Sequence, residues 1–216
     1  MLKAIIFDMD GVLVDSEPFI LEAATQMLAE HGLTAQQEDF KPFVGAGEDR
    51  FVGGPAEKYG LTLDIPAAKA RTYAIYDEIT RGHLEPLSGV RDFIAAARAM
   101  GLRLAVASSA DRIKIGINLR EIGIDPGSFD AIVSGEDVEN KKPSPDIFLV
   151  AAERLGALPA ECIVVEDAVT GVAAAKAAGM RCLALTTSFT PDQLAGADWI
   201  ARDLSSVTPD AFSKAA

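Results

Sequence analysis

Five short and almost wholly apolar segments recur along this chain, and they constrain its fold more than any other feature. Each has three to six residues without polar alternation, which is typical of a strand buried on both faces of a sheet. They span residues 4–7, 102–107, 131–133, 163–165 and 183–185. Helical patterns, each followed by a glycine, lie at residues 92–100, 113–122, 145–155 and 169–178. This alternation predicts an α/β fold, a parallel sheet with helices on both faces.

The residues after the first apolar segment break this alternation. From residue 16 to residue 85 we find no convincing strand, whereas apolar residues spaced three and four apart indicate a helix over residues 20–28. Two further helical patterns follow before residue 85. We therefore expect an α/β core domain made of residues 1–15 and 86–216, with a small all-helical domain of residues 16–85 inserted after the first strand.

The charge balance argues against several classes of partner. The chain has 20 Lys and Arg against 32 Asp and Glu, which gives a formal net charge of −12. Nucleic acids and anionic membranes bind basic surfaces, so we expect neither as a partner. No uncharged stretch exceeds ten residues, about half of what a membrane-spanning helix needs. Without a secretory signal pattern, and with Cys162 and Cys182 in apolar segments that suit free thiols, we expect a cytoplasmic protein.

Pairs of acidic residues follow two of the apolar segments. Asp8 and Asp10 come after the first segment, and Glu166 and Asp167 come after the fourth. Carboxylates at the end of a buried strand are costly without a partner, and oxygen ligands are those that Mg²⁺ prefers. For the first pair, a simple turn is the alternative, because Asp-Gly is frequent in turns. Open α/β sheets bind their ligands at the carboxyl ends of the strands, so the pairs predict a metal site at that edge of the sheet.

Two other polar clusters suit an anion. Ser108 and Ser109 follow the second apolar segment, where hydroxyl groups and free backbone N–H groups at a helix start can bind phosphate; an ordinary N-cap is the alternative. After Lys142, Ser144 suits the N-cap of a helix and Pro145 its first position, so Lys142 would lie at the mouth of the sheet; a solvated lysine is the alternative. Together the four clusters hold the parts of a phosphoryl-transfer site. A metal ion and Lys142 would also let this acidic chain bind an anion.

The segment from Asp8 to Glu17 resembles the first motif of the haloacid dehalogenase-like hydrolases. The other motifs of that superfamily follow in the same order, at Ser108, Lys142-Pro143 and Glu166-Asp167. With its helical insertion the chain resembles the β-phosphoglucomutase-like and phosphoglycolate phosphatase-like members over nearly its whole length. The resemblance implies a Rossmann-like core with a helical cap, Mg²⁺ dependence and hydrolysis of a small phosphorylated metabolite, such as a sugar phosphate. A monomer is the default for these members.

The resemblance also implies a role for each motif residue. Asp8 would attack the phosphorus and form an aspartyl-phosphate. Asp10 would protonate the leaving alcohol and then deprotonate the hydrolytic water. The groups implied to hold Mg²⁺ are Asp8, the backbone carbonyl of Asp10, Asp167 and, in support, Glu166. The groups implied to bind phosphate are Ser108, Lys142 and the backbone N–H of Ser109, joined by that of Met9.

Three competing activities differ at particular residues. Dehalogenases of this superfamily lack the second acid, so Asp10 and Asp167 argue against that chemistry. Mutases of the β-phosphoglucomutase type carry a histidine soon after Ser-Glu-Pro, where this chain has Ile20, which cannot donate a hydrogen bond. In a phosphate-responsive receiver module the lysine is the last site residue along the sequence. Here Lys142 precedes Glu166. The sequence therefore favours a phosphatase, with the sugar-phosphate mutase as the alternative.

In capped members, substrate selection comes from cap residues that face the sheet edge. The loop at residues 45–50 is the expected contact, and its candidate residues are Gly47, Glu48 and Arg50. Arg50 could contact a negative group and Glu48 could accept from a hydroxyl. Weaker candidates lie in the last helical pattern of the insertion, where packing or solvation is an equal alternative; they are Arg71, Thr72 and Tyr76.

Overall fold

The computed structural model describes residues 1–43 and 47–212. Within these residues, six parallel strands form one sheet in the order β3-β2-β1-β4-β5-β6. The strands are β1 (Ala4–Phe7), β2 (Arg103–Ala107), β3 (Ala131–Val133), β4 (Cys162–Glu166), β5 (Arg181–Leu185) and β6 (Trp199–Ala201). The predicted α/β class with a parallel sheet is confirmed. β6 was not predicted from the sequence, although its three residues are as apolar as those of β3; this edge strand is only partly buried.

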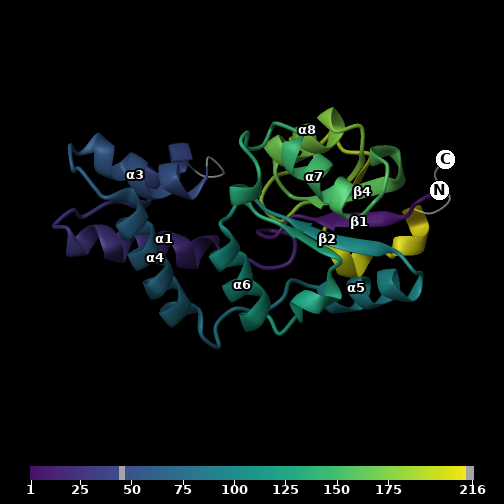
Figure 1. Cartoon of the computed structure of the whole chain (residues 1–216), viewed down its shortest axis with the longest axis horizontal. Coiled ribbons are helices and arrows are strands. Elements are labelled where there is room, and N and C mark those ends of the chain that lie inside the picture. Colours follow the sequence, from purple (N-terminus) through teal and green to yellow (C-terminus); the bar gives the residue numbers. More distant parts are fainter. Residues whose placement is uncertain (44–46, 213–216) are drawn as a thin grey trace.

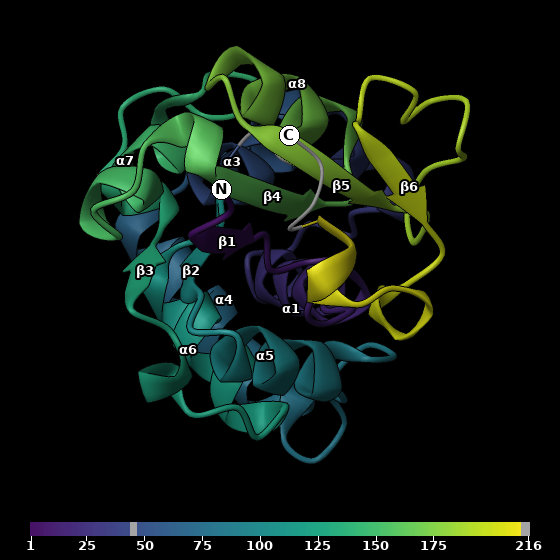
Figure 2. The same ribbon diagram turned by 90° about the vertical axis from the view of Figure 1, so that its right-hand side faces the viewer.

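Helices cover both faces of the sheet (Figures 1 and 2). One face packs on α5 (Val90–Ala99) and α6 (Arg112–Glu121), and the other on α7 (Asp146–Arg154) and α8 (Val169–Ala177). Successive side chains of β1 enter opposite clusters, Phe7 the first and Ile6 the second. A strand buried on both faces must therefore be apolar at every position, which is what the sequence of β1 shows.

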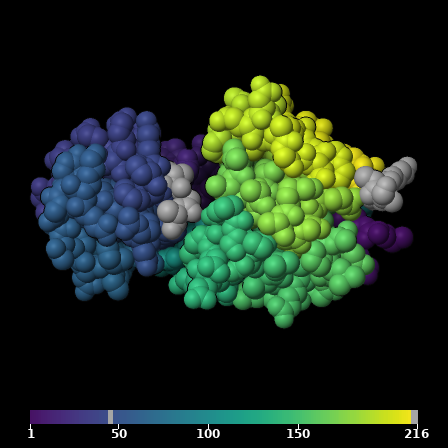
Figure 3. Space-filling model, turned by 90° about the horizontal axis from the view of Figure 1, so that it is seen from above, coloured from purple at the N-terminus to yellow at the C-terminus, as the bar shows by residue number. Residues whose placement is uncertain are grey.

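The segment between β1 and α5 is helical. Its helices are α1 (Glu17–Glu30), α2 (Gln37–Phe40), α3 (Glu48–Lys58) and α4 (Ile65–Thr80). They surround a hydrophobic cluster of their own, which includes the fully buried Met27 and Tyr76. Figure 1 shows this segment beyond the carboxyl ends of the strands, and Figure 3 shows it as a separate lobe. The predicted helical insertion after the first strand is confirmed; we call it the helical cap below.

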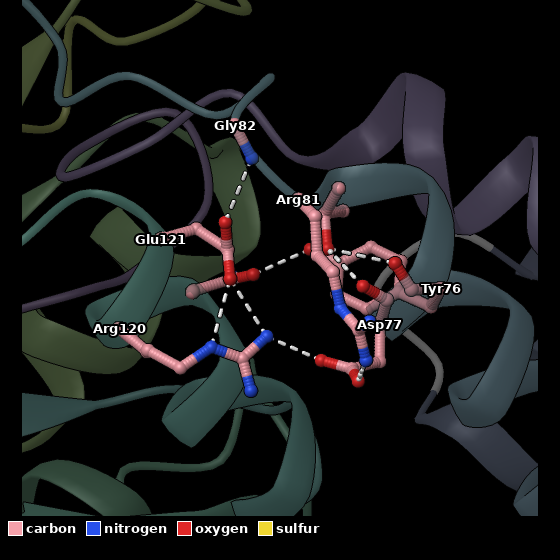
Figure 4. Close-up of polar contacts among 8 residues, drawn as sticks. Tyr76, Asp77, Arg81, Gly82, Arg120 and Glu121 are labelled. Atoms are coloured by element: carbon pink, nitrogen blue, oxygen red, sulfur yellow. Dashed lines mark hydrogen bonds and ion pairs between the residues drawn. The ribbon is translucent and has the colours of Figure 1, made fainter.

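The helical cap docks on α6 through a row of polar contacts, part of which Figure 4 shows. The pairs are Lys69–Asp111, Tyr76–Asn118, Asp77–Arg120 and the N–H of Gly82 with Glu121. Ile117 adds an apolar contact, because its side chain belongs to the cluster inside the cap. Exposed ion pairs contribute little to stability, so the buried contacts of Asn118 and Ile117 carry most of this docking.

Smaller features complete the chain. Short 3₁₀ helices lie at Lys41–Phe43, Pro126–Ser128, Gly135–Asp137, Pro159–Glu161, Leu204–Ser206 and Pro209–Phe212. Cys162 and Cys182 are buried free thiols, as predicted. The expectation for Ser144 was wrong: its hydroxyl donates to Asp146 at 2.7 Å instead of capping a helix, and α7 begins one residue after Pro145. Among the described residues no helix is both long and apolar enough to cross a membrane.

The Leu104→Ala variant tests the hydrophobic cluster that the sheet forms with α5 and α6. Leu104 of β2 is fully buried, so Leu104→Ala should lower the free energy of unfolding by about 2–5 kcal/mol. Leu149 of α7 is 40% exposed and provides a matched control, whose alanine variant should change that free energy by less than about 0.5 kcal/mol. Urea denaturation followed by circular dichroism measures both. Equal losses in the two variants would contradict the assigned core.

Candidate active site

The carboxyl end of β1 places Asp8 at the centre of the sheet edge that faces the helical cap (Figure 1). The backbone N–H of Asp8 donates to the carbonyl of Val165 at 2.9 Å, which continues the ladder between β1 and β4. The chain then turns sharply, with Gly11 at φ +72° and Leu13 N–H donating to the Met9 carbonyl at 2.8 Å. The Asp8 side chain is consequently fixed at the edge and almost fully buried.

Lys142 contacts the acidic side chains at the carboxyl ends of β1 and β4. Its Nζ lies 2.6 Å from Asp8 Oδ1 and 2.6 Å from Glu166 Oε1, and 4.8 Å from the centre of the Phe148 ring. The other oxygen of Glu166 accepts from the backbone N–H groups of Asp167 and Ala168, both at 2.8 Å. Buried charges need partners, and this arrangement supplies one for each of these three side chains.

The electrostatic balance at this edge remains negative. Burial, together with the nearby Glu166 and Asp10, raises the pKa of Asp8 to about 7, although Lys142 opposes the shift. Burial, Glu166 and Asp8 raise the pKa of Asp167 to about 8. Burial alone would lower the pKa of Lys142, but its two carboxylate partners outweigh it and raise that pKa. The edge therefore has more buried carboxylate than one lysine can compensate.

Two glycines allow these carboxylates to lie against the backbone. A Cβ built on Gly11 would lie 1.9 Å from Asp167 Oδ2, so the Asp167 side chain directly contacts the turn after β1. A Cβ built on Gly171 would lie 1.7 Å from Glu166 Oε1, although Gly171 has an ordinary helical position in α8. Packing of the acidic pair thus leaves no room for a side chain at either position, and the positive φ of Gly11 is a second reason for glycine there.

Asp10 points to a different set of partners from Asp8. Its Oδ2 lies 2.6 Å from Nζ of Lys114, a buried residue of α6, and its Oδ1 accepts from the hydroxyl of Ser16. Asp10 nevertheless lies close enough to Asp8 to raise the pKa of that carboxyl. The two acids of the first motif therefore share one site and have separate supporting groups.

The predicted phosphate-binding serines follow β2, the neighbour of β1 in the sheet. Phe7 pairs with Val106, so the following Ser108 lies beside the end of β1. Ser108 is buried, and its hydroxyl accepts from the backbone N–H of Ala110 at 3.2 Å. Ser109 is only partly buried and approaches the loop after β3 at Gly135. The structure thus brings Ser108 and Ser109 to the same edge as Asp8 and Lys142.

The cap candidates divide into two groups. Gly47 approaches the core, because a Cβ built there would lie 3.5 Å from Cε of Lys141. Glu48 lies near Lys114 and Asp10; burial, Asp10 and Asp111 raise its pKa to about 7. Arg50 instead binds Glu57 at 3.0 Å and stacks on Phe43 within the cap. Gly45 and Ala46 of the expected contact loop lie outside the described residues.

The weaker cap candidates are occupied elsewhere. Arg71 forms an exposed ion pair with Glu30 inside the cap. Thr72 is buried and its hydroxyl donates to the carbonyl of Ala68 at 2.9 Å. Tyr76 is fully buried and donates to Asn118. Packing, the alternative that the sequence left open, describes Thr72 and Tyr76 better than substrate contact.

Several side chains around the acids were not predicted from the sequence. Ser188, in the loop after β5, donates to Asp167, and Thr187 donates to the carbonyl of Gly11 at 2.6 Å. Lys114 lies in the helix predicted over residues 113–122, and the sequence predicted no site role for it. A signal existed for it: Lys114 and Asn118 are four residues apart, on the same side of a helix that also buries isoleucines. Polar residues on a buried helical face need partners.

The donor atoms fit a hard divalent cation such as Mg²⁺. Their chemistry is carboxylate oxygen, and burial, together with the neighbouring acids, raises the pKa values of Asp8 and Asp167. Across residues 1–43 and 47–212, no three His, Cys, Asp or Glu side chains are grouped as a ready-made metal site. Lys142 Nζ lies between Asp8 and Glu166, so its ammonium group is the cation that contacts these two carboxylates.

Comparisons with known proteins point to one family. The family model described as haloacid dehalogenase-like hydrolase matches residues 2–179. The chain is 43% identical over 215 residues to Protein SUPPRESSOR OF QUENCHING 1, chloroplastic, of Arabidopsis thaliana; the match covers 96% of this chain and 20% of that protein. The chain thus spans about a fifth of that plant protein.

Two smaller proteins match along most of their length. The phosphorylated carbohydrates phosphatase of Thermotoga maritima is 33% identical over 189 residues, which cover 83% of each chain. The crystal structure of a CbbY variant from Rhodobacter sphaeroides, in complex with xylulose-(1,5)bisphosphate, superposes with a TM-score of 0.85. That pair is 27% identical, and the match covers 95% of this chain and 96% of the other.

Two helical glycines provide a matched test of the site's packing. Gly171→Ala should lower the free energy of unfolding by about 1–3 kcal/mol, because the new methyl group would overlap the fixed Glu166 carboxylate. Gly116 of α6 has no atom within 4 Å of a built Cβ, so Gly116→Ala should raise that free energy by up to about 1 kcal/mol. Urea denaturation measures both. A stabilising Gly171→Ala would contradict the described packing.

Proposed function

The chain belongs to the haloacid dehalogenase-like hydrolase family, and we propose that it is a Mg²⁺-dependent phosphatase that hydrolyses a small phosphorylated sugar. The observation that carries the proposal is Asp8, fixed at the end of the central strand with Lys142 Nζ 2.6 Å from its Oδ1. A carboxylate nucleophile and a cation that can bind phosphoryl oxygens then occupy the same edge.

In the first proposed step, an oxygen of Asp8 attacks the phosphorus of the substrate. A bond forms between Asp8 and phosphorus while the ester bond between phosphorus and the sugar oxygen breaks. Asp10, protonated for this step, gives its proton to the leaving alkoxide, so the sugar departs as a neutral alcohol. The pair of acids at this strand end supports this assignment, because Asp10 reaches the site without sharing the partners of Asp8.

In the second step, a water molecule attacks the phosphorus of the aspartyl-phosphate. Asp10, now ionised, accepts a proton from that water, and the bond between Asp8 and phosphorus breaks to release inorganic phosphate. Lys142, the hydroxyl of Ser108 and the backbone N–H of Ser109 would bind phosphate oxygens in both steps. The Asp8 carboxylate and the protonated Asp10 are restored at the end of the cycle.

The carboxylates of Asp8 and Asp167 and the backbone carbonyl of Asp10 would hold Mg²⁺, with Glu166 supporting them. When bound, Mg²⁺ supplies positive charge that offsets the phosphate and the buried acids. Lys142 compensates Asp8 and Glu166, whereas Asp167 has the Ser188 hydroxyl as its hydrogen-bond donor. That difference supports Asp167 as a ligand.

A small sugar phosphate suits the covered position of the site. The helical cap lies over the sheet edge and contacts both α6 and the loop that carries Lys141. A cap in this position favours a small ligand over a folded phosphoprotein or a polynucleotide. The phosphatase from Thermotoga maritima is named for phosphorylated carbohydrates, and the CbbY structure holds a sugar bisphosphate, which supports the same class of substrate here.

The mutase alternative lacks a supporting side chain. Ile20 lies where such mutases carry a histidine, and it packs inside the cap cluster, buried and without a donor group. The protein should therefore form no net glucose 6-phosphate from β-glucose 1-phosphate. Incubation with β-glucose 1-phosphate and its bisphosphate, followed by product analysis, decides the question. Net formation of glucose 6-phosphate would assign the mutase instead.

Removal of the proposed nucleophile should abolish turnover. Asp8→Asn keeps the size of the side chain but removes the carboxylate that attacks phosphorus, so release of inorganic phosphate should fall below detection. Mass spectrometry of acid-quenched samples should show phosphate attached to the unchanged protein and none attached to the variant. Asp92→Asn, on the exposed surface of α5, is the control that should keep full activity. Phosphate release by Asp8→Asn at the unchanged rate would refute the covalent step.

Metal removal should act on stability as well as on activity. Chelation should stop phosphate release, and added Mg²⁺ should restore it and raise the melting temperature, because a ligand of the folded state stabilises it. Asp167→Asn should abolish the Mg²⁺-dependent rise, whereas Asp92→Asn should retain it. Differential scanning fluorimetry measures the shift. A shift of equal size in Asp167→Asn would exclude Asp167 as a ligand.

A further inference from the structure

Lys114 of α6 is buried at the edge of the site, although the proposed chemistry assigns it no task. Its side chain is 3% exposed, and its Nζ lies 2.6 Å from Asp10 Oδ2. Transfer of an ammonium group out of water costs several kcal/mol unless a partner of opposite charge compensates it. A lysine is therefore a costly choice for ordinary helix packing at this position, and its contact with Asp10 needs another explanation.

The second oxygen of Asp10 is held by a chain of hydrogen bonds that reaches into the helical cap. The Ser16 hydroxyl donates to Asp10 Oδ1, and Asn118 Nδ2 donates to the Ser16 oxygen at 3.3 Å. The Tyr76 hydroxyl of α4 donates in turn to Asn118 Oδ1. Figure 4 shows Tyr76 next to Asp77, the residue of α4 that pairs with Arg120 of α6. Ser16, Asn118 and Tyr76 are all fully buried, so this chain of contacts is shielded from water.

We propose that Lys114 is a positioning residue, which holds the Asp10 carboxyl group in the orientation needed to reach the leaving oxygen of the substrate. This inference rests on the proposed function, in which Asp10 transfers the proton. With one oxygen bound to Lys114 and the other to Ser16, rotation of the carboxyl group is restricted. About a quarter of the Asp10 side chain stays exposed, so a bound ligand can still contact it.

The same geometry links the orientation of Asp10 to the docked cap. Lys114 and Asn118 lie one helical turn apart on α6, and the cap contacts this helix at Asn118 and at Asp111. Glu48 of the cap also lies near Lys114 and Asp10. When the cap rests on α6, both oxygens of Asp10 have fixed partners. A misplacement of about 1 Å in a catalytic group can lower the rate about 10²-fold.

Lys114→Met tests the inference, because methionine has a similar length and no charge. The readout is kcat/KM, which covers the steps up to departure of the alcohol, for two phosphate esters of different leaving group. For the best alkyl phosphate in a metabolite panel, whose alkoxide needs a proton, kcat/KM should fall about 10–100-fold. For p-nitrophenyl phosphate, whose phenolate leaves without protonation, it should fall less than about 3-fold.

A purely structural role would change both esters alike. Equal losses of kcat/KM for the two substrates, or no loss for either, would overturn the inference. Lys176→Met is the matched control, because Lys176 also pairs with an aspartate at 2.6 Å but lies on α8, away from Asp10. This control should leave both kcat/KM values within about 2-fold of the unchanged protein, as surface substitutions usually do.

A second variant covers the case in which Lys114→Met does not fold. Lys114→Gln keeps a hydrogen-bond donor without the charge, so it should show the same selectivity between esters with a smaller loss for the alkyl phosphate. Circular dichroism melting establishes that each variant is folded. A folded Lys114→Gln that loses the two activities equally would overturn the inference. If the unchanged protein hydrolyses neither ester, the proposed function itself fails, which is a distinct outcome.

Discussion

The contact of Lys142 with Asp8 and Glu166 is the interaction on which the rest of the site depends. A parallel sheet directs the carboxyl ends of its strands to one edge, and this chain places acidic residues at two of the central ends. Uncompensated burial of such groups costs several kcal/mol each. Lys142 compensates two carboxylates with one ammonium group, and Asp167 keeps a pKa raised to about 8. The fold therefore concentrates negative charge that a cation would stabilise.

The helix α6 connects this charged edge to the helical cap. One side of α6 packs on the sheet, and another carries Lys114, Asn118 and Arg120, which contact Asp10 or the cap. The same helix thus supports the proposed acid and holds the cap over the site. An acidic chain with a net charge of −12 can then bind an anion locally, because its buried lysines and a metal ion act over short distances.

The strands and the polar residues that follow them could be predicted because both depend on local sequence. An apolar run followed by Asp8, Ser108 or Asp167 specifies a buried strand and a polar edge without knowledge of the neighbours. The edge strand β6 was not predicted although its three residues are all apolar, and its partly exposed place in the sheet depends on the tertiary structure. Ser188 and Lys114 escaped for another reason: their roles arise from contacts between segments 21 and 104 residues apart. Arg50 was predicted from its charge to contact a negative group of the substrate, but it pairs with Glu57 within the cap.

The most direct test of the account is a crystal structure of the protein with Mg²⁺ and beryllium fluoride, which mimics a phosphoryl group on a carboxylate. The account requires the fluoride complex to be bonded to a carboxylate oxygen of Asp8. Lys142 should contact its fluorine atoms, Asp167 should contact the metal ion, and Asp10 should remain bound to Lys114. A complex attached at another residue, or Asp8 still bound only to Lys142 in a fully loaded crystal, would contradict the assignment of Asp8 as the nucleophile.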